Sequence, residues 1–128
     1  MASGVRAVGV ITVEHRFDPE CLYSARDPYV ERYWLPSFGP TALVLLRRLA
    51  LDATANPTTS YDDAWLGAAV GVKASQVYSV LARLERFERA LRVDETTWEV
   101  DAMIPAVDPK HYRRLPAGYD DELLTGVR

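Results

Sequence analysis

The stretch from Trp65 to Phe87, WLGAAVGVKASQVYSVLARLERF, constrains the fold of this chain more than any other. Its first part is rich in small apolar residues and ends at Gly71, a residue suited to the left-handed backbone that closes a helix. Its second part repeats apolar residues at helical spacing, at Val77, Val80, Leu81 and Leu84. The pattern predicts two helices joined by a tight turn, over residues 61–70 and from about Ala74 to Phe87 or Arg89.

The segment before this pair of helices contains signals for a helix start. Ser60 and Asp63 have the spacing of a capping box, and acidic residues in a first turn suit the helix dipole. We therefore expect TANPTTS, residues 54–60, to be a connector. Before it, GPTALVLLRRLALDA has the spacing of an amphipathic helix that ends near Ala53.

The N-terminal third of the chain is less regular. Residues 5–13 suggest a strand or a frayed arm. Asp27 and Pro28 predict the N-cap and first residue of a short helix that Pro36 stops. Its aromatic residues are expected mainly to cover the core; they are Tyr29, Tyr33, Trp34 and Phe38.

The stretch ALRVDETTWEV, residues 90–100, predicts a β-hairpin because apolar and polar residues alternate on both sides of DETT. A four-residue turn would place Val93 opposite Trp98. Arg92 would then face Glu99, a favourable cross-strand pair.

The order of helix, helix–turn–helix and hairpin resembles that of winged helix-turn-helix DNA-binding domains over about residues 40–103. The resemblance rests on Leu66–Val72, similar to the family's second helix and turn, and on Lys73–Leu84, similar to its third helix. It implies a mainly α fold with a small β-hairpin, that is, a three-helix core plus a wing. Residues 1–39 would form an N-terminal arm with a short aromatic helix, and residues 104–128 a C-terminal tail with basic and acidic stretches.

The resemblance also implies sequence-specific binding of double-stranded DNA by a transcriptional regulator, with the helix over residues 74–87 in the major groove. Base contacts would come from Gln76, Tyr78 and Ser79, and phosphate contacts from Lys73, Ser75 and Arg83. Further positive charge would come from Arg47, Arg48, Arg86 and the basic stretch Lys110–Arg114.

Two features depart from the family pattern. Ser79 stands where many relatives have arginine, and the expected hairpin tip carries Asp94 and Glu95. Phosphates repel an acidic tip, so we expect that the hairpin does not insert deeply into DNA. The alternative is a protein-interaction module that does not bind DNA directly and uses the aromatic segment Tyr29–Phe38 and the acidic tip. A homodimer is a further expectation, through the same aromatic segment or the C-terminal tail.

Composition excludes several other classes of protein. With a net charge of −3 over 128 residues, the chain lacks the basic excess of indiscriminate polyanion binders. Cys21 is the single cysteine, and together with His15 and His111 it is too scattered to suggest a metal site, so we expect no metal site and no cofactor. The sequence shows no convergent catalytic motif and no apolar run long enough for a membrane span, and its N-terminal segment leads us to expect no signal peptide. We therefore expect a soluble, cytoplasmic protein that is not an enzyme.

Overall fold

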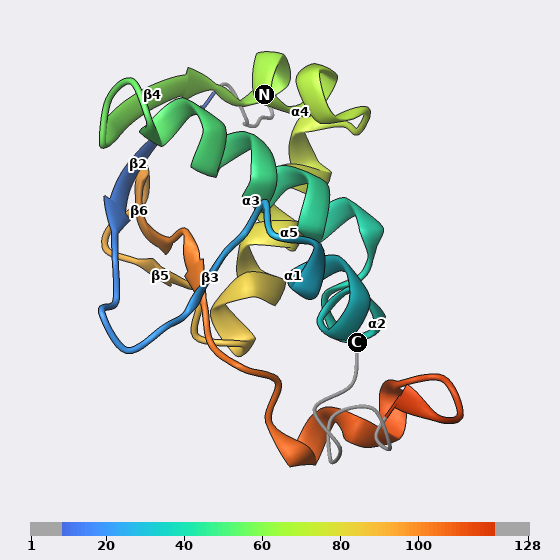
Figure 1. Ribbon diagram of the computed structural model, residues 1–128. Helices are drawn as coiled ribbons and strands as arrows, with labels where there is room; N and C mark the ends of the chain where they lie inside the picture. The colour runs from blue at the N-terminus through green and yellow to red at the C-terminus, as the bar shows by residue number, and fades with distance from the viewer. Residues whose placement is uncertain (1–8, 120–128) are drawn as a thin grey trace.

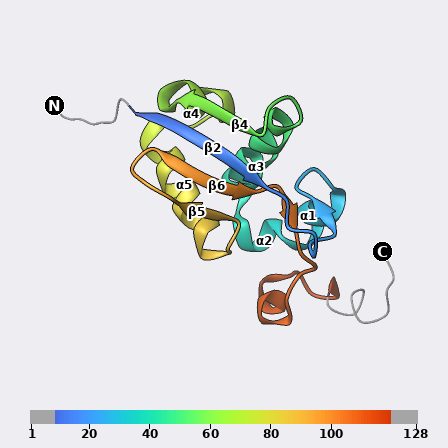
Figure 2. The ribbon, with the colours of Figure 1, turned by 90° about the vertical axis from the view of Figure 1, so that its left-hand side faces the viewer.

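The computed structural model describes residues 9–119, in which helices pack on one face of a four-stranded sheet (Figure 1, Figure 2). The helices are α1 (Pro28–Tyr33), α2 (Leu35–Phe38), α3 (Pro40–Ala53), α4 (Asp63–Val70), α5 (Ala74–Arg86) and the 3₁₀ helix η1 (Pro109–Arg114). The strands are β2 (Val10–Arg16), β3 (Tyr23–Ser24), β4 (Thr58–Asp62), β5 (Ala90–Arg92), β6 (Thr97–Asp101) and β7 (Met103–Ile104).

The main sheet has the strand order β4-β2-β6-β5, and β3 pairs with β7 in a separate two-stranded sheet. Strand β2 pairs antiparallel with β4 and parallel with β6. The prediction of a mainly α winged helix-turn-helix with only a small hairpin is therefore wrong. The hairpin is half of a mixed sheet, because a strand from the predicted N-terminal arm lies between it and β4.

Strand β2 can occupy the middle of the sheet because its residues alternate. Ile11 and Val13 are fully buried against the helices, whereas Thr12 and Glu14 lie on the opposite face. The Thr12 hydroxyl lies 3.0 Å from the Ser60 hydroxyl of β4, so that face carries polar cross-strand contacts. Sequence alone left this segment as a strand or an arm, since nothing local reveals which strands will pair with it.

The core lies between the sheet and the helices. Helix α3 contributes Leu45, Leu46 and Leu49, and α5 contributes Val77, Leu81 and Leu84; none of these side chains is exposed to solvent. These positions follow the helical spacing of the sequence, which confirms both predicted apolar stripes.

The short helices around the aromatic segment agree in part with the predictions. Asp27 caps α1 by accepting a 2.8 Å hydrogen bond from the Tyr29 amide, and Pro28 is the first helical residue. The helix ends at Tyr33, and Pro36 lies in the first turn of α2. The expectation that the aromatic side chains cover the core is confirmed, since all four are buried: Tyr29, Tyr33, Trp34 and Phe38.

The segment before α4 differs from the prediction. Residues 58–62 form strand β4, where a connector and the start of a helix were expected. Helix α4 begins at Asp63, and its N-cap is Asp62, whose carboxylate accepts a 2.9 Å hydrogen bond from the Trp65 amide. The predicted capping box at Ser60 is wrong because β2 supplies backbone partners that draw this segment into the sheet.

The hairpin is present with a register shifted by one residue. Arg92 lies opposite Trp98 and Leu91 opposite Glu99. The Val93 amide donates to the Thr97 carbonyl at 2.9 Å, so residues 94–96 form the loop. The predicted Arg92–Glu99 pair is therefore wrong. The Arg92 guanidinium donates to the carbonyls of Asp94 and Glu95 instead.

Two further observations concern membrane spans and the ends of the chain. Among residues 9–119, no helix is both long and apolar enough to cross a membrane. The acidic part of the predicted C-terminal tail, residues 120–122, lies outside the described residues, as do residues 1–8.

Candidate nucleic-acid interface

Helices α4 and α5 form a helix–turn–helix through two glycines. Gly71 ends α4 with φ 85° and ψ 25°, the left-handed conformation that its sequence position predicted. At Gly67 a Cβ atom would lie 2.7 Å from the carbonyl oxygen of Val72, so only glycine allows the turn to approach α4 this closely. The Val72 amide then donates to the Gly67 carbonyl at 2.8 Å. The predicted pair of helices is confirmed, with α4 starting two residues later than expected.

Helix α5 packs on the core with one face and exposes a polar face. Ser75, Gln76 and Ser79 are exposed, and Ala82 continues their row. The Gln76 Oε1 atom accepts a 2.9 Å hydrogen bond from the Lys73 amide, which leaves the Gln76 amide nitrogen as a donor. The Ser79 hydroxyl lies 3.4 Å from the Ser75 carbonyl. The N-terminal half of this face therefore has short side chains and carries no charge between Lys73 and Arg83.

Tyr78 does not belong to the exposed face. Its hydroxyl donates to the Asp63 carboxylate at 2.8 Å, and the same Oδ2 atom accepts from the Gly9 amide at 3.0 Å. Asp63 is only 1% exposed, so Tyr78 helps to satisfy a buried acceptor at the junction of α4, α5 and the N-terminal end of β2. We therefore leave Tyr78 out of the interface.

Three of the predicted arginines are bound within the fold. Arg83 donates from Nε to the Phe38 carbonyl at 2.6 Å and from its Nη2 atom to the Ser37 carbonyl, at the end of α2. Arg47 donates to the Ala25 carbonyl and forms an ion pair with Glu31 at 3.0 Å. Arg48 pairs with Asp52 at 3.3 Å and lies over the Trp65 ring. The structure does not bring these two α3 arginines to the α5 face.

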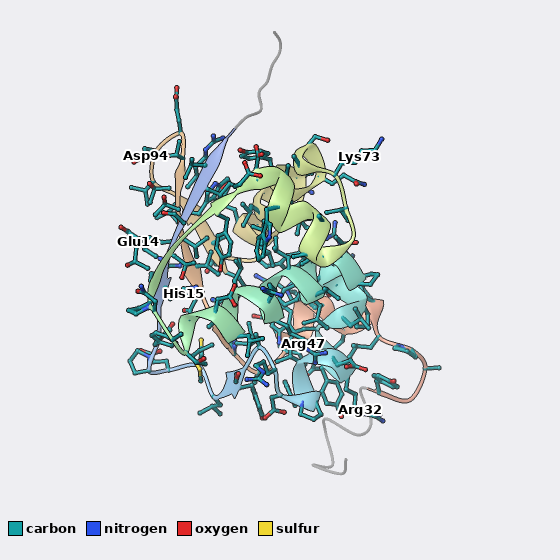
Figure 3. All side chains as sticks on the ribbon, turned by 90° about the horizontal axis from the view of Figure 1, so that it is seen from above. Glu14, His15, Arg32, Arg47, Lys73 and Asp94 are labelled. Atoms are coloured by element: carbon teal, nitrogen blue, oxygen red, sulfur yellow. The ribbon has the colours of Figure 1, made fainter. Side chains whose placement is uncertain are left out.

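Lys73 and the hairpin tip lie at the periphery of the α5 side. Figure 3 shows Lys73 at the turn and Asp94 at the tip projecting from one side of the molecule, with Arg47 and Arg32 toward the other. The Asp94 carboxylate accepts hydrogen bonds from the amides of Thr96 and Thr97, both at 2.9 Å. These bonds, that of Thr96 foremost, hold the pKa of Asp94 below its ordinary value. The Asp94 carboxylate at the tip is therefore favoured in its charged form and closes the loop through these hydrogen bonds.

A second group of cations gathers at the other end of α5. Arg86 in the last turn of α5 lines the same cavity as Lys110 and Arg114 of η1. The basic stretch Lys110–Arg114 was visible in the sequence as a source of charge. Its position beside α5 was not visible, because Lys110 lies 24 positions after Arg86 along the chain.

Sequence reasoning also missed a cluster of groups that could ligate a metal. Ligand atoms of Asp18, Cys21 and Asp101 lie within 4.8 Å of one another. The guanidinium of Arg89 lies among them, 3.5 Å from Asp101 and 3.7 Å from the Cys21 sulfur. Burial raises the pKa of the Cys21 thiol, although Arg89 opposes the shift. The arginine already supplies the positive charge that these groups need, so they fit an internal ion pair better than a metal centre.

Comparison with known proteins finds one likeness, which concerns the fold. No family model matches the chain, and no curated protein matches it. The chain is similar to a solved structure of primosome protein DnaB (residues 1–300) from Geobacillus stearothermophilus, with a TM-score of 0.67 and 16% identity. The match covers 96% of this chain and spans 52% of the length of the other, and at this identity the likeness concerns the fold alone.

Proposed function

We propose that this chain binds double-stranded DNA with helix α5 in the major groove. The observation that carries the proposal is a helix–turn–helix whose second helix keeps one face open, polar and short-chained. Ser75, Gln76 and Ser79 would meet base edges, and Lys73 at the start of the helix would meet a phosphate.

The shape and chemistry of this face suit such a groove. Thirteen residues make a helix of about 20 Å, and the major groove is about 12 Å wide. The short side chains let the helix backbone approach the base edges. The Gln76 amide can address adenine, and the serine hydroxyls can both donate and accept hydrogen bonds.

The charges around this face indicate modest, salt-dependent binding. Lys73 and Arg86 are exposed cations at the two ends of α5, whereas Asp94 and Glu95 are exposed acids at the hairpin tip. Phosphates repel the tip, so the hairpin would stay outside the groove, as the sequence predicted. Few phosphates would be neutralised, and the dependence of affinity on salt would be shallow.

The structural neighbour is named as a primosome protein, and the likeness to it concerns the fold alone. Regulation of transcription stays a prediction from the sequence resemblance, as does a homodimer. The aromatic rings of residues 29–38 are buried, so we do not propose them as a docking surface for a protein partner.

The test is a titration of a labelled duplex of mixed sequence, followed by fluorescence anisotropy at about 50 and 200 mM salt. We expect the affinity to fall with salt. Lys73→Gln should lower the affinity and reduce the slope of log affinity against log salt by about 1. Glu95→Lys should raise the affinity, because it replaces an acid near the DNA by a base.

Arg26→Gln provides a matched control. Arg26 is an exposed cation between β3 and α1, and its loss changes the net charge by the same amount as Lys73→Gln. It should leave the affinity within about twofold, since charges beyond a Debye length of roughly 10 Å are screened. The proposal fails if the wild-type protein shows no salt-dependent affinity for the duplex. It also fails if Lys73→Gln and Arg26→Gln weaken duplex binding equally.

A further inference from the structure

A cavity of about 410 Å³ lies between the C-terminal end of α5 and the segment that carries η1. Its volume is within the usual range of about 300–1,000 Å³ for small-molecule sites. One wall is aromatic and consists of Trp34, Phe87 and His111, whose ring centroids lie 5.2–6.3 Å apart. Phe87 and His111 are half-buried, so a planar group in the cavity could pack against them.

The rim of the cavity is cationic although the whole chain is acidic. Among the described residues, five arginines and lysines line it with only two carboxylates, Glu88 and Asp108. Arg83 and Arg89 are bound to backbone carbonyls of the fold. Arg86, Lys110 and Arg114 make no ion pair within residues 9–119 and are exposed. Three cations are therefore available to an anion in the cavity.

The histidine in the aromatic wall adds a directional donor. The Nδ1 atom of His111 lies 3.1 Å from Nη1 of Arg114, and because arginine can only donate, Nδ1 accepts. A neutral imidazole then carries its proton on Nε2. Burial lowers the pKa of His111, and the neighbouring Arg114 and Lys110 lower it further. The His111 ring therefore lies in the positive potential of Arg114 and Lys110, which would also act on an anion in the cavity.

We propose that this cavity binds a nucleoside phosphate, with the phosphate on Arg86, Lys110 and Arg114 and the base against the rings of Phe87 and His111. A cationic rim next to an aromatic wall matches the two halves of such a ligand. The nucleotide can be free in solution or part of a single strand, and the chemistry of recognition is the same. Lys73, Ser75, Gln76 and Ser79 do not line the cavity, so this site shares with the surroundings of the proposed duplex interface only Arg86, at the far end of α5.

The experiment is calorimetric titration of the full chain with adenosine 5′-monophosphate, with adenosine and inorganic phosphate as partial ligands. We expect the nucleotide to bind at least about tenfold more tightly than either part, because only the whole ligand uses both halves of the cavity. Lys110→Gln and Arg114→Gln should each weaken nucleotide binding about tenfold through a lost charge-assisted contact.

Arg113→Gln is the matched control, since Arg113 lies between these two residues, is exposed and does not line the cavity. It should change nucleotide affinity less than about twofold. A second readout is the His111 imidazole followed by NMR during a pH titration. Its pKa should rise when the nucleotide is bound, because a nearby anion favours the charged ring.

The same titration with a short single-stranded oligonucleotide separates the two sources. Competition between the strand and the mononucleotide would mean that the cavity accepts nucleotides within a strand, and binding of the mononucleotide alone would mean a free ligand. The proposal is overturned if neither binds, or if Lys110→Gln, Arg114→Gln and Arg113→Gln have equal effects. Lys73→Gln should leave nucleotide binding unchanged, so the two proposals can fail separately.

Discussion

Glu88 is the non-glycine residue with positive φ among residues 9–119, with φ 61°. It follows α5, where the Glu88 amide donates to the Glu85 carbonyl and the Arg89 amide to the Leu84 carbonyl, both at 2.9 Å. This pair of bonds is a common way to end a helix, and the residue at its left-handed position is usually glycine. A glutamate in this conformation costs roughly 1–2 kcal/mol. Glu88 thus lines the cationic cavity although its backbone has a left-handed conformation that glutamate disfavours.

Replacing Glu88 by glycine should raise the free energy of unfolding by roughly 0.5–1 kcal/mol. The gain is the relieved left-handed strain less the greater backbone entropy that glycine loses on folding. The variant also removes one of the two acids that line the cavity, so nucleotide affinity should rise. Urea denaturation and calorimetry measure the two effects. Glu88→Ala separates them, because it removes the carboxylate and keeps the strain. A glycine variant less stable than the wild type would contradict this account of the backbone.

At the scale of elements, α5 is tied to α2 by Arg83 and ends at Arg86, three residues later. The Arg83 guanidinium donates to two carbonyls at the C-terminal end of α2, where cations are favoured. The sequence could not separate these two arginines, since both follow the polar face of one helix. Their different roles come from the position of α2, which is 45 residues away from Arg83 at Phe38.

Arg83→Gln should lower the free energy of unfolding by about 1–3 kcal/mol, because two carbonyls lose a charged donor. Arg86→Gln should change it by less than about 0.5 kcal/mol, as for most surface substitutions. Thermal denaturation of the two variants side by side measures the difference. Equal melting temperatures would show that the link between α5 and α2 does not contribute to stability.

Helices were also the elements that the sequence predicted best. Helix α3 has the predicted end at Ala53, and α5 begins at the predicted Ala74. The local signals were apolar spacing in α3 and α5, a proline start in α1 and a glycine stop in α4, all of which act within a few residues. Strand β4 was missed and the hairpin register was wrong by one residue, because each depends on a partner strand or on the loop bonds of Asp94.

At the scale of the whole molecule, β2 carries a histidine into the interior. His15 is the next inward residue after Ile11 and Val13, and both ring nitrogens are buried without a hydrogen-bond partner among the described residues. Burial lowers the pKa of His15 from its ordinary value of 6.5, while the Asp52 carboxylate opposes this shift. Folding therefore favours the neutral ring, and protonation of this ring favours the unfolded chain.

We expect the free energy of unfolding to decline as the pH falls below about 6.5. The folded pKa lies below the unfolded pKa, so the unfolded chain binds more protons in this range and stability is complete only above it. His15→Leu should remove most of the decline between about pH 6.5 and 5, before carboxylates titrate. Urea denaturation at several pH values across this range measures the free energy of unfolding of the wild type and of the variant. His111→Gln is the control for the other histidine, whose pKa is also lowered. The same decline in His15→Leu as in the wild type would contradict this assignment.

For the candidate sites too, local features could be predicted from the sequence and long-range contacts could not. The sequence predicted that Ser75, Gln76 and Ser79 lie on the exposed face of α5, because helical spacing assigns each residue to a face, and Lys73 before the helix is exposed as well. The internal partners of Tyr78 and of three arginines, Arg47, Arg48 and Arg83, were not found, since a long polar side chain can reach groups that the sequence does not place nearby.

The sequence by itself determined α3, the turn at Gly71, the polar face of α5 and the burial of the aromatic segment. Each depends on interactions within a few residues along the chain or on the amount of apolar surface to be buried. Only the tertiary structure decided that β2 enters the middle of the sheet and that Arg86 meets η1 at a cationic cavity. Strand pairing and charge clustering join segments that are distant in sequence, and their energies depend on geometry that no local pattern contains.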